Sequence, residues 1–271
     1  RMMSSETISS SAISIASVPL LLVPGMMCDS ALWQEQIEVI QQSRAVHVVT
    51  FSNEASIAEM AEAAIKQMID SFPTHLPVAV AGLSMGGIVA FEIWRRCPDR
   101  IAGLAFLNTT HSPDSPERRI QRERQINAAK DGQLYWLLRD ELKPSYTGVD
   151  ALPATVMDRV MAMGLRMGPT AFVAQSAALR DRLDSSATLG TITCQTLVMC
   201  GDRDALCPVS RHQEIADAIP TATLEVLPDC GHLSTLERPK EVTTHLQSWL
   251  LNSDHAAYMQ SNGGESASPI G

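Results

Sequence analysis

Residues 82–86 read Gly-Leu-Ser-Met-Gly, and the serine at their centre has the setting of a nucleophile. An apolar run from Val78 precedes this pentapeptide, and an apolar helical pattern follows it as far as Pro98. A strand, a tight turn and a helix in this order strain the backbone at the serine, so glycine is needed two residues before and after it. The hydroxyl of Ser84 should then project from a sheet at the positive end of a helix. The alternative is a flexible connector without chemistry.

A serine hydroxyl is a weak nucleophile at neutral pH, so it needs a base and an acid that orients the base. We predict that His232 is the base, because it lies in the loop after the last predicted strand and Gly231 lets that loop turn. His111 is the competing histidine. Two carboxylates follow the predicted strand 195–200. Asp204, further into the loop, is predicted to orient His232, whereas Asp202 is predicted to form turn hydrogen bonds.

An oxyanion that forms on a carbonyl substrate needs two backbone N–H donors, each of which lowers the barrier by about 3–4 kcal/mol. The N–H of Met85, directly after Ser84, is one predicted donor. The N–H of Met26 is the other, because residues 23–27 follow the first strong strand and Gly25 permits close approach. These five residues at these places predict acyl transfer on a serine, without a metal or cofactor.

Strand-like and helix-like segments alternate along most of the chain, which predicts an α/β fold with a mostly parallel sheet and helices on both faces. The predicted strands are 18–23, 45–51, the run before Ser84, 101–107, 195–200 and 223–227, and the predicted helices include 30–42, 57–69, 209–219 and 239–251. The core is therefore assigned to 18–108 and 190–251. Residues 1–17 are predicted to be a flexible segment, and 252–271 a disordered tail.

Between these two parts of the core, residues 109–189 carry no strong strand signal. Helical stretches are predicted at 116–129, 132–142, 153–167 and 169–183, and proline stands at the start of three of them, where a first helical turn accepts it. This insertion is predicted to form a four-helix lid over the carboxyl ends of the strands, where ligands bind in such sheets.

The composition limits the class of partner. A net charge of −9 argues against nucleic acid and against an anionic membrane, and no apolar stretch is long enough to span a bilayer. The expected ligand is a small neutral molecule, and the expected assembly is a monomer or homodimer in the cytoplasm. The six cysteines lack metal-site spacing and are interpreted as reduced and structural, although Cys28, Cys207 and Cys230 fall in loops near the predicted site.

Four motifs in order make the chain resemble α/β-hydrolase fold enzymes with a helical lid, of the esterase and enol-lactonase-like branch. The motifs are Leu22-Val-Pro-Gly-Met26, Gly82-Leu-Ser-Met-Gly86-Gly87, Cys200-Gly-Asp-Arg-Asp204 to Pro208, and Cys230-Gly-His232 to Pro239. The resemblance implies a triad of Ser84, Asp204 and His232. The chain departs from the family pattern in two places: Pro24 replaces a common histidine, and Phe51 leads almost directly into a helix instead of a long glycine-rich loop.

The lid should supply most of the substrate pocket. The predicted pocket residues are Met27, Trp136, Met157, Met161 and Phe172, with core packing as the alternative for the methionines. The run Arg118, Arg119, Arg122 and Arg124 is interpreted as a solvated helix face, with a carboxylate clamp as the alternative.

The leading hypothesis is hydrolysis of a small, largely apolar carboxylic ester or lactone through an acyl-serine intermediate. Serine at position 84 argues against dehalogenase and epoxide hydrolase chemistry, but it leaves C–C bond hydrolysis, thioester hydrolysis, acyl transfer and perhydrolysis open. Two hypotheses from other classes are a non-catalytic receptor for a small ligand and an interaction module that docks through the lid.

Overall fold

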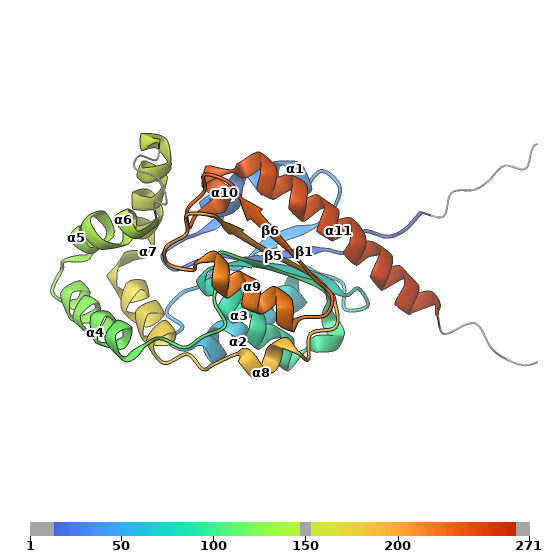
Figure 1. Ribbon diagram of the computed structural model, residues 1–271, viewed down its shortest axis with the longest axis horizontal. Coiled ribbons are helices and arrows are strands. Elements are labelled where there is room, and N and C mark those ends of the chain that lie inside the picture. Colours follow the sequence, from blue (N-terminus) through green and yellow to red (C-terminus); the bar gives the residue numbers. More distant parts are fainter. Residues whose placement is uncertain (1–13, 147–152, 264–271) are drawn as a thin grey trace, which may run out of the picture.

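A six-stranded parallel sheet forms the centre of the molecule (Figure 1). The computed structural model describes residues 14–146 and 153–263. The strand order is β2-β1-β3-β4-β5-β6, and every neighbouring pair is parallel. The strands are β1 (Leu20–Val23), β2 (Val46–Val48), β3 (Val78–Leu83), β4 (Ile101–Leu107), β5 (Gln195–Gly201) and β6 (Ala222–Leu227). The predicted parallel α/β architecture is confirmed.

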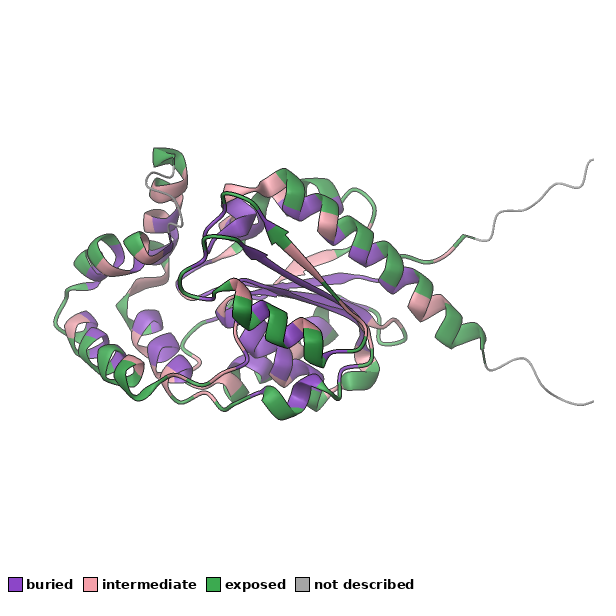
Figure 2. Cartoon of the chain, in the orientation of Figure 1, coloured by how far each residue is buried: buried purple, intermediate pink, exposed green. Residues whose placement is uncertain are grey.

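Helices cover both faces of this sheet, which explains why its central strands are continuously apolar. Every residue of β1, β3 and β4 is buried, as the purple strands of Figure 2 show. Helices α1 (Gln34–Ile40) and α11 (Pro239–Asn262) pack on one face. Helices α2 (Ile57–Ser71), α3 (Met85–Arg96) and α9 (Val209–Ala218) contribute to the core on the other. The carboxyl ends of the strands are left for loops.

Two core elements differ in length from their predictions. The predicted helix 30–42 is divided into a 3-10 turn, η1 (Ser30–Trp33), and α1, and the side chain of Asp29 caps η1 by accepting from the N–H of Ala31. Strand β2 is shorter than the predicted 45–51, because it lies at the sheet edge and pairs only with β1. Short turns η2 (Pro98–Arg100) and α10 (Ser234–Glu237) complete the core, and α8 (Ser186–Leu189) ends the segment inserted between β4 and β5.

The insertion between β4 and β5 is helical and lies beside the core in Figure 1. Its elements are α4 (Pro116–Lys130), the consecutive α5 (Leu134–Leu137), η3 (Leu138–Leu142) and α6 (Lys143–Tyr146), and α7 (Ala154–Arg180). Helix α7 bends sharply at Gly168, whose φ of 84° is left-handed, and Pro169 follows this bend. Helix α4 packs along α7. Within the two described ranges, no helix is both long and apolar enough to cross a membrane.

The prediction of a disordered tail from residue 252 is wrong for residues 252–262, because α11 continues to Asn262. Asp254 holds this part of the helix against the sheet: its carboxylate accepts from the backbone N–H of Val18 at 2.8 Å and pairs with Arg44 at 2.9 Å. The polar composition of the segment concealed these buried contacts. The rest of the predicted tail, residues 264–271, and residues 1–13 of the predicted flexible segment lie outside the described residues.

Candidate active site

Ser84 occupies a strained turn between β3 and α3. Its φ of 55° and ψ of −114° lie outside the regions that L-residues normally adopt. Four hydrogen bonds hold the turn: the N–H of Ser84 donates to Leu107 O, and its carbonyl accepts from the N–H groups of Gly87 and Ile88 and from the Thr109 hydroxyl. The strain is retained because the neighbouring strands and helix fix the backbone from both sides.

The two glycines of the motif are required by close backbone contact. A Cβ on Gly82 would lie 2.2 Å from the carbonyl oxygen of Gly86, and a Cβ on Gly86 would lie 2.0 Å from that of Val23. Both distances are far below van der Waals contact. The absence of side chains therefore lets α3 begin directly against β1 and β3, as the sequence predicts.

Ser84, His232 and Asp204 form one hydrogen-bonded chain. His232 Nε2 lies 2.9 Å from Ser84 Oγ, and His232 Nδ1 lies 2.9 Å from Asp204 Oδ2. The His232 and Asp204 side chains are buried, with 3% and 0% of their surfaces exposed. The predicted nucleophile, base and acid are thus brought together. Asp202 instead accepts from the backbone N–H of Cys230, in keeping with its predicted role in the turn.

Asp204 remains an anion despite its burial. Burial raises the pKa of this carboxyl group, but the charge of His232 and hydrogen bonds from His232, from the N–H of Cys207 and from the Asn108 amide outweigh that effect and hold the pKa below its usual range. Its Oδ1 accepts from the N–H groups of Leu206 and Cys207 at 3.0 and 2.9 Å. Because Asp204 is charged and accepts from Nδ1, it fixes the tautomer in which Nε2 faces Ser84 as a base.

Asn108 and Glu237 position the acid and the base, and the sequence analysis assigned neither of them. Asn108, directly after β4, donates to Asp204 Oδ2 at 3.0 Å and to Gly231 O at 3.1 Å. Glu237 accepts from the N–H groups of Gly231 and Leu233, on either side of His232. The position of Asn108 at the end of a strand was the available signal, because the carboxyl ends of parallel strands share one edge.

The predicted oxyanion donors are the N–H groups of Met85 and Met26, and their role stays a prediction. Met85 is the first residue of α3, so its N–H has no partner within the helix. Met26 lines the same cavity as Ser84 and His232. The next residue, Met27, has a φ of 57° and donates its N–H to Gln175 Oε1 at 2.8 Å. Gln175 of α7 thereby fixes the loop that carries Met26.

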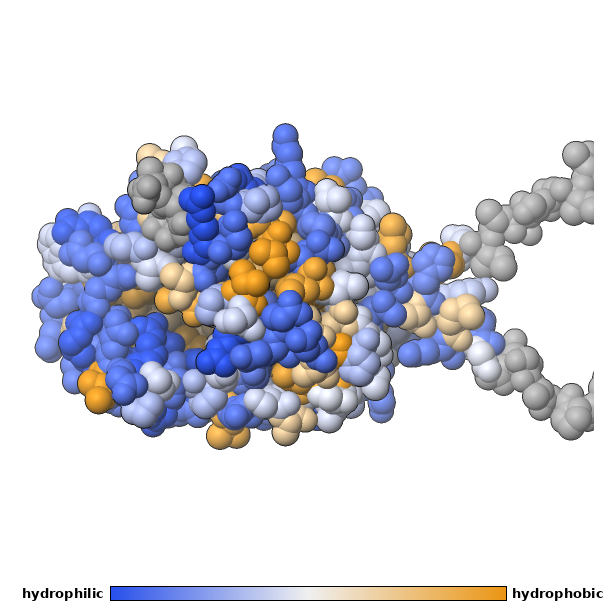
Figure 3. Space-filling model, viewed as in Figure 1, coloured by the Kyte–Doolittle hydropathy of each residue, from blue (hydrophilic) through white to orange (hydrophobic). Residues whose placement is uncertain are grey.

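A cavity of about 510 Å³ extends from Ser84 and His232 to the lid. Figure 3 shows the surface hollowed between the lid helices and the core, with hydrophilic residues at its rim. Its apolar lining includes Met26, Ile88 and Leu179, and the Tyr146 ring stacks on the His232 ring with centroids 5.5 Å apart. Four arginines also line it, namely Arg118, Arg122, Arg182 and Arg211. The lining is thus more polar than a largely apolar substrate would require.

The five predicted pocket residues are not among those that line this cavity. Met27 and Phe172 are buried in the core, and Met161 packs against it. Met157 is half-buried on α7. Trp136 is exposed and packs under the guanidinium of Arg139. Apolar residues on a lid helix can face the core, the cavity or solvent, and of these five only Met27, Phe172 and Met161 pack in or against the core.

The four arginines from Arg118 to Arg124 are predicted from the sequence to form a solvated helix face, with a carboxylate clamp as the alternative. The structure shows two of them in solvent and two at the cavity. Arg119 and Arg124 are solvated, with side chains 48% and 56% exposed, as the sequence indicates. Arg118 and Arg122 instead face the cavity. Their spacing of four residues places them on one face of α4 and is the signal that could have found them. His111, the competing histidine, pairs with Glu214 rather than with Ser84.

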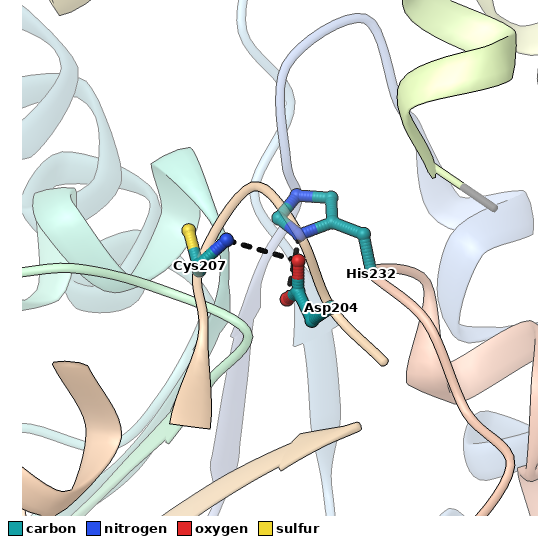
Figure 4. Close-up of side chains that lie close together, drawn as sticks. All are labelled: Asp204, Cys207 and His232. Carbon is teal, nitrogen blue, oxygen red and sulfur yellow. Dashed lines mark hydrogen bonds and ion pairs between the residues drawn. The ribbon is translucent and has the colours of Figure 1, made fainter. Parts of the chain in front are cut away.

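Asp204, Cys207 and His232 lie close enough together to be tested as a metal site. Figure 4 shows the Cys207 sulfur directed away from the carboxylate, while its N–H and His232 both bond to Asp204. Burial and the charge of Asp204 raise the pKa of the Cys207 thiol, so it is not a thiolate ligand. Both nitrogens of His232 are already bonded. These donors fit a triad better than a metal. All six cysteines are free thiols.

A partly buried serine hydroxyl, with a buried imidazole and a buried carboxylate, at the carboxyl edge of a parallel sheet defines an enzyme of the hydrolase class. A sequence model described as "Alpha/beta hydrolase family" matches residues 20–244. The chain belongs to this alpha/beta hydrolase family.

Known proteins place it among the esterase-like members. A thermophilic esterase from Thermogutta terrifontis is 29% identical, with a TM-score of 0.78 over 88% of this chain and 90% of that one. A pimeloyl-(acyl-carrier protein) methyl ester esterase of Aliivibrio salmonicida is 24% identical over 87% of this chain and 93% of its own. The enol-lactonase from Burkholderia xenovorans LB400, 20% identical, shares the fold with a TM-score of 0.78 over 87% of this chain and 92% of that one.

Proposed function

We propose that the protein hydrolyses a small carboxylic ester or lactone through a covalent acyl-serine intermediate. The observation that carries this proposal is the continuous chain from Ser84 Oγ through His232 to the Asp204 carboxylate, with both links at 2.9 Å. The similarity to two esterases supports an ester bond as the target.

The reaction follows from the position of each group. His232 Nε2 takes the proton of Ser84 as its oxygen attacks the carbonyl carbon, and the imidazolium that forms is stabilised by Asp204. The N–H groups of Met85 and Met26 hold the oxyanion of the tetrahedral intermediate. When the C–O bond breaks, His232 returns the proton to the leaving alcohol. Water then attacks the acyl-serine by the same route and releases the acid.

The shape of the site suits this reaction. A cavity of about 510 Å³ lies within the range typical of small-molecule sites. It is continuous with Ser84 and His232, so an ester that fills it can place its carbonyl at the nucleophile. The Tyr146 ring against His232 shields the base from one side.

Replacement of the nucleophile tests the proposal. We expect Ser84→Ala to lower kcat for p-nitrophenyl acetate by about 10⁴-fold or more, as loss of a triad member does elsewhere. A fluorophosphonate probe should label the natural protein at Ser84 and leave the variant unlabelled. Ser112→Ala is the matched control, because Ser112 lines the same cavity while the two ring nitrogens of His232 bond to Ser84 and Asp204. A Ser84→Ala protein that retained wild-type turnover would refute the acyl-serine mechanism.

A further inference from the structure

The cavity over Ser84 contains more positive charge than its own acids neutralise. Arg122 and Arg182 both pair with one carboxylate, Asp114, and the three side chains are only 6%, 9% and 2% exposed. Glu141 also lines the cavity, but Arg124, outside the lining, pairs with it. Within the part of the chain that the structure describes, no second carboxylate pairs with Arg122 or Arg182.

Arg118 adds a third guanidinium to this wall without an acidic partner. Across the described residues 14–146 and 153–263, Arg118 forms no ion pair, and its guanidinium donates to the neutral Gln121 Oε1 at 2.5 Å. It is half-buried and lines the same cavity as Ser84 and His232. The other arginine of the lining, Arg211, pairs with Glu214 and is 44% exposed. Arg118 is thus the cavity cation that is available to a ligand.

The positive charge around Arg118 favours the binding of an anion. Burial and repulsion by Arg122 and Arg182 lower the pKa of Arg118, although Asp114 attracts it. Burial also lowers the pKa of Arg182 against the attraction of Asp114. Three arginines face one carboxylate in a chain whose net charge is −9, so this wall differs in sign from the molecule as a whole. A guanidinium that keeps its planar fork free is well suited to a carboxylate.

We propose that Arg118, supported by Arg122 and Arg182, binds a carboxylate of the substrate, so that the enzyme acts on esters or lactones that carry a second, free carboxylate. This inference rests on the proposed function, because it assigns the part of the ligand that lies away from Ser84. A single accessible guanidinium matches a monoanion. The Asp114 carboxylate holds Arg122 and Arg182 in place, so they contribute charge rather than direct contacts.

Half-esters of dicarboxylic acids test this assignment because each has a neutral counterpart of nearly equal size. Monomethyl and dimethyl esters of succinate, glutarate, adipate and suberate should be compared at pH 7.5, where the free carboxyl group of each half-ester is ionised. Each compound is measured as a substrate, by methanol release, and as a competitor of p-nitrophenyl acetate hydrolysis. A half-ester that binds without being cleaved therefore still gives a result.

We expect one chain length at which the half-ester is preferred over its dimethyl counterpart by about 10- to 100-fold, the range for a hydrogen-bonded charge. Arg118→Gln should lower that preference by at least about tenfold, and Arg118→Lys should restore part of it. Arg119→Gln is the matched control, because it removes the same charge from the exposed side of the same helix. It should leave the preference unchanged.

Two outcomes separate this inference from the proposed function. If the protein hydrolyses p-nitrophenyl acetate but shows no preference for a half-ester at any length, or if Arg118→Gln and Arg119→Gln have equal effects, the carboxylate site is refuted and the esterase stands. If neither p-nitrophenyl acetate turnover nor fluorophosphonate labelling occurs, the proposed function itself has failed.

Discussion

Asn108 shows how one buried side chain can serve two catalytic residues at once. Its amide nitrogen donates to Asp204 and to the carbonyl of Gly231, next to His232, while its amide oxygen accepts from the Ser234 hydroxyl at 2.6 Å. Asn108 also has a φ of 49°, a conformation that asparagine tolerates better than most residues. The acid loop and the base loop are therefore connected through the side chain of Asn108.

Replacing Asn108 should separate its hydrogen bonds from its backbone conformation. We expect Asn108→Gly to keep the left-handed backbone, lose the amide bonds, and lower kcat by about 10-fold or more together with about 2 kcal/mol of stability. Asn108→Ala should be less stable than the glycine variant by about 1 kcal/mol, because alanine resists that backbone. Urea unfolding and p-nitrophenyl acetate kinetics measure both effects. Wild-type kcat in Asn108→Gly would show that Asp204 and His232 hold their positions unaided.

His212 should make the stability of the fold depend on pH. It is fully buried in α9; its Nε2 accepts from the N–H of Thr109 at 2.9 Å, and burial lowers its pKa from 6.5 to about 4. Between these two values the unfolded chain binds a proton that the folded chain excludes, so stability is lost as the pH falls through this window. The loss attributable to His212 should approach about 3 kcal/mol at the acid end.

A neutral acceptor at position 212 provides the comparison. His212→Gln should be less sensitive to pH between about 6.5 and 4 than the natural protein, because it cannot titrate. Urea unfolding at several pH values across the window measures the difference in slope. Identical pH profiles for the two proteins would mean that another group controls acid stability.

At the scale of elements, residues with strained backbone angles gather at the carboxyl edge of the sheet. The four non-glycine residues with positive φ in the described ranges are Met27, Ser84, Asn108 and Asp229, and they follow β1, β3, β4 and β6. Such conformations persist where the surrounding structure holds them, and they gather at functional sites. The parallel sheet supplies that support, because each of its five pairs of neighbouring strands is hydrogen-bonded in a defined register.

Close packing at this edge predicts the effect of adding a single methyl group. We expect Gly86→Ala to destabilise the fold by about 3 kcal/mol or more, because its Cβ would overlap the backbone of Val23 and push α3 away from β1. Gly190→Ala is the matched control, because nothing lies within 4 Å of the added Cβ. It should be neutral or slightly stabilising. Thermal unfolding of both variants tests this, and equal midpoints would contradict the packing argument.

The parts of the site that the sequence predicts are those that a local pattern encodes. The glycines around Ser84, the order of Asp204 and His232, and the loops after strands follow from spacing along the chain. The direction of the lid side chains does not, because it depends on how α4 and α7 dock. Phe172 therefore proves to be core, whereas Arg118 faces the cavity, although its spacing of four residues from Arg122 hinted at that face.

At the scale of the whole molecule, the two ends of the described fold are joined by one buried ion pair. Arg44, before β2, and Asp254, in the last part of α11, are 5% and 7% exposed, and Asp254 also accepts from the N–H of Val18 before β1. Contacts between residues that are far apart in sequence thus attach the final helix to the edge of the sheet. A segment whose composition suggests a tail is instead part of the folded core.

Removing this carboxylate should destabilise the whole domain. We expect Asp254→Ala to lower the free energy of unfolding by about 3–5 kcal/mol, because the buried guanidinium of Arg44 and the N–H of Val18 both lose their partner. Glu241→Ala removes an exposed acid from the first turn of the same helix and should cost about 1 kcal/mol or less. Urea unfolding that monitors tryptophan fluorescence, to which Trp249 on α11 contributes, measures both variants. A loss for Asp254→Ala no larger than that for Glu241→Ala would show that residues beyond 251 contribute little to the stability of the core.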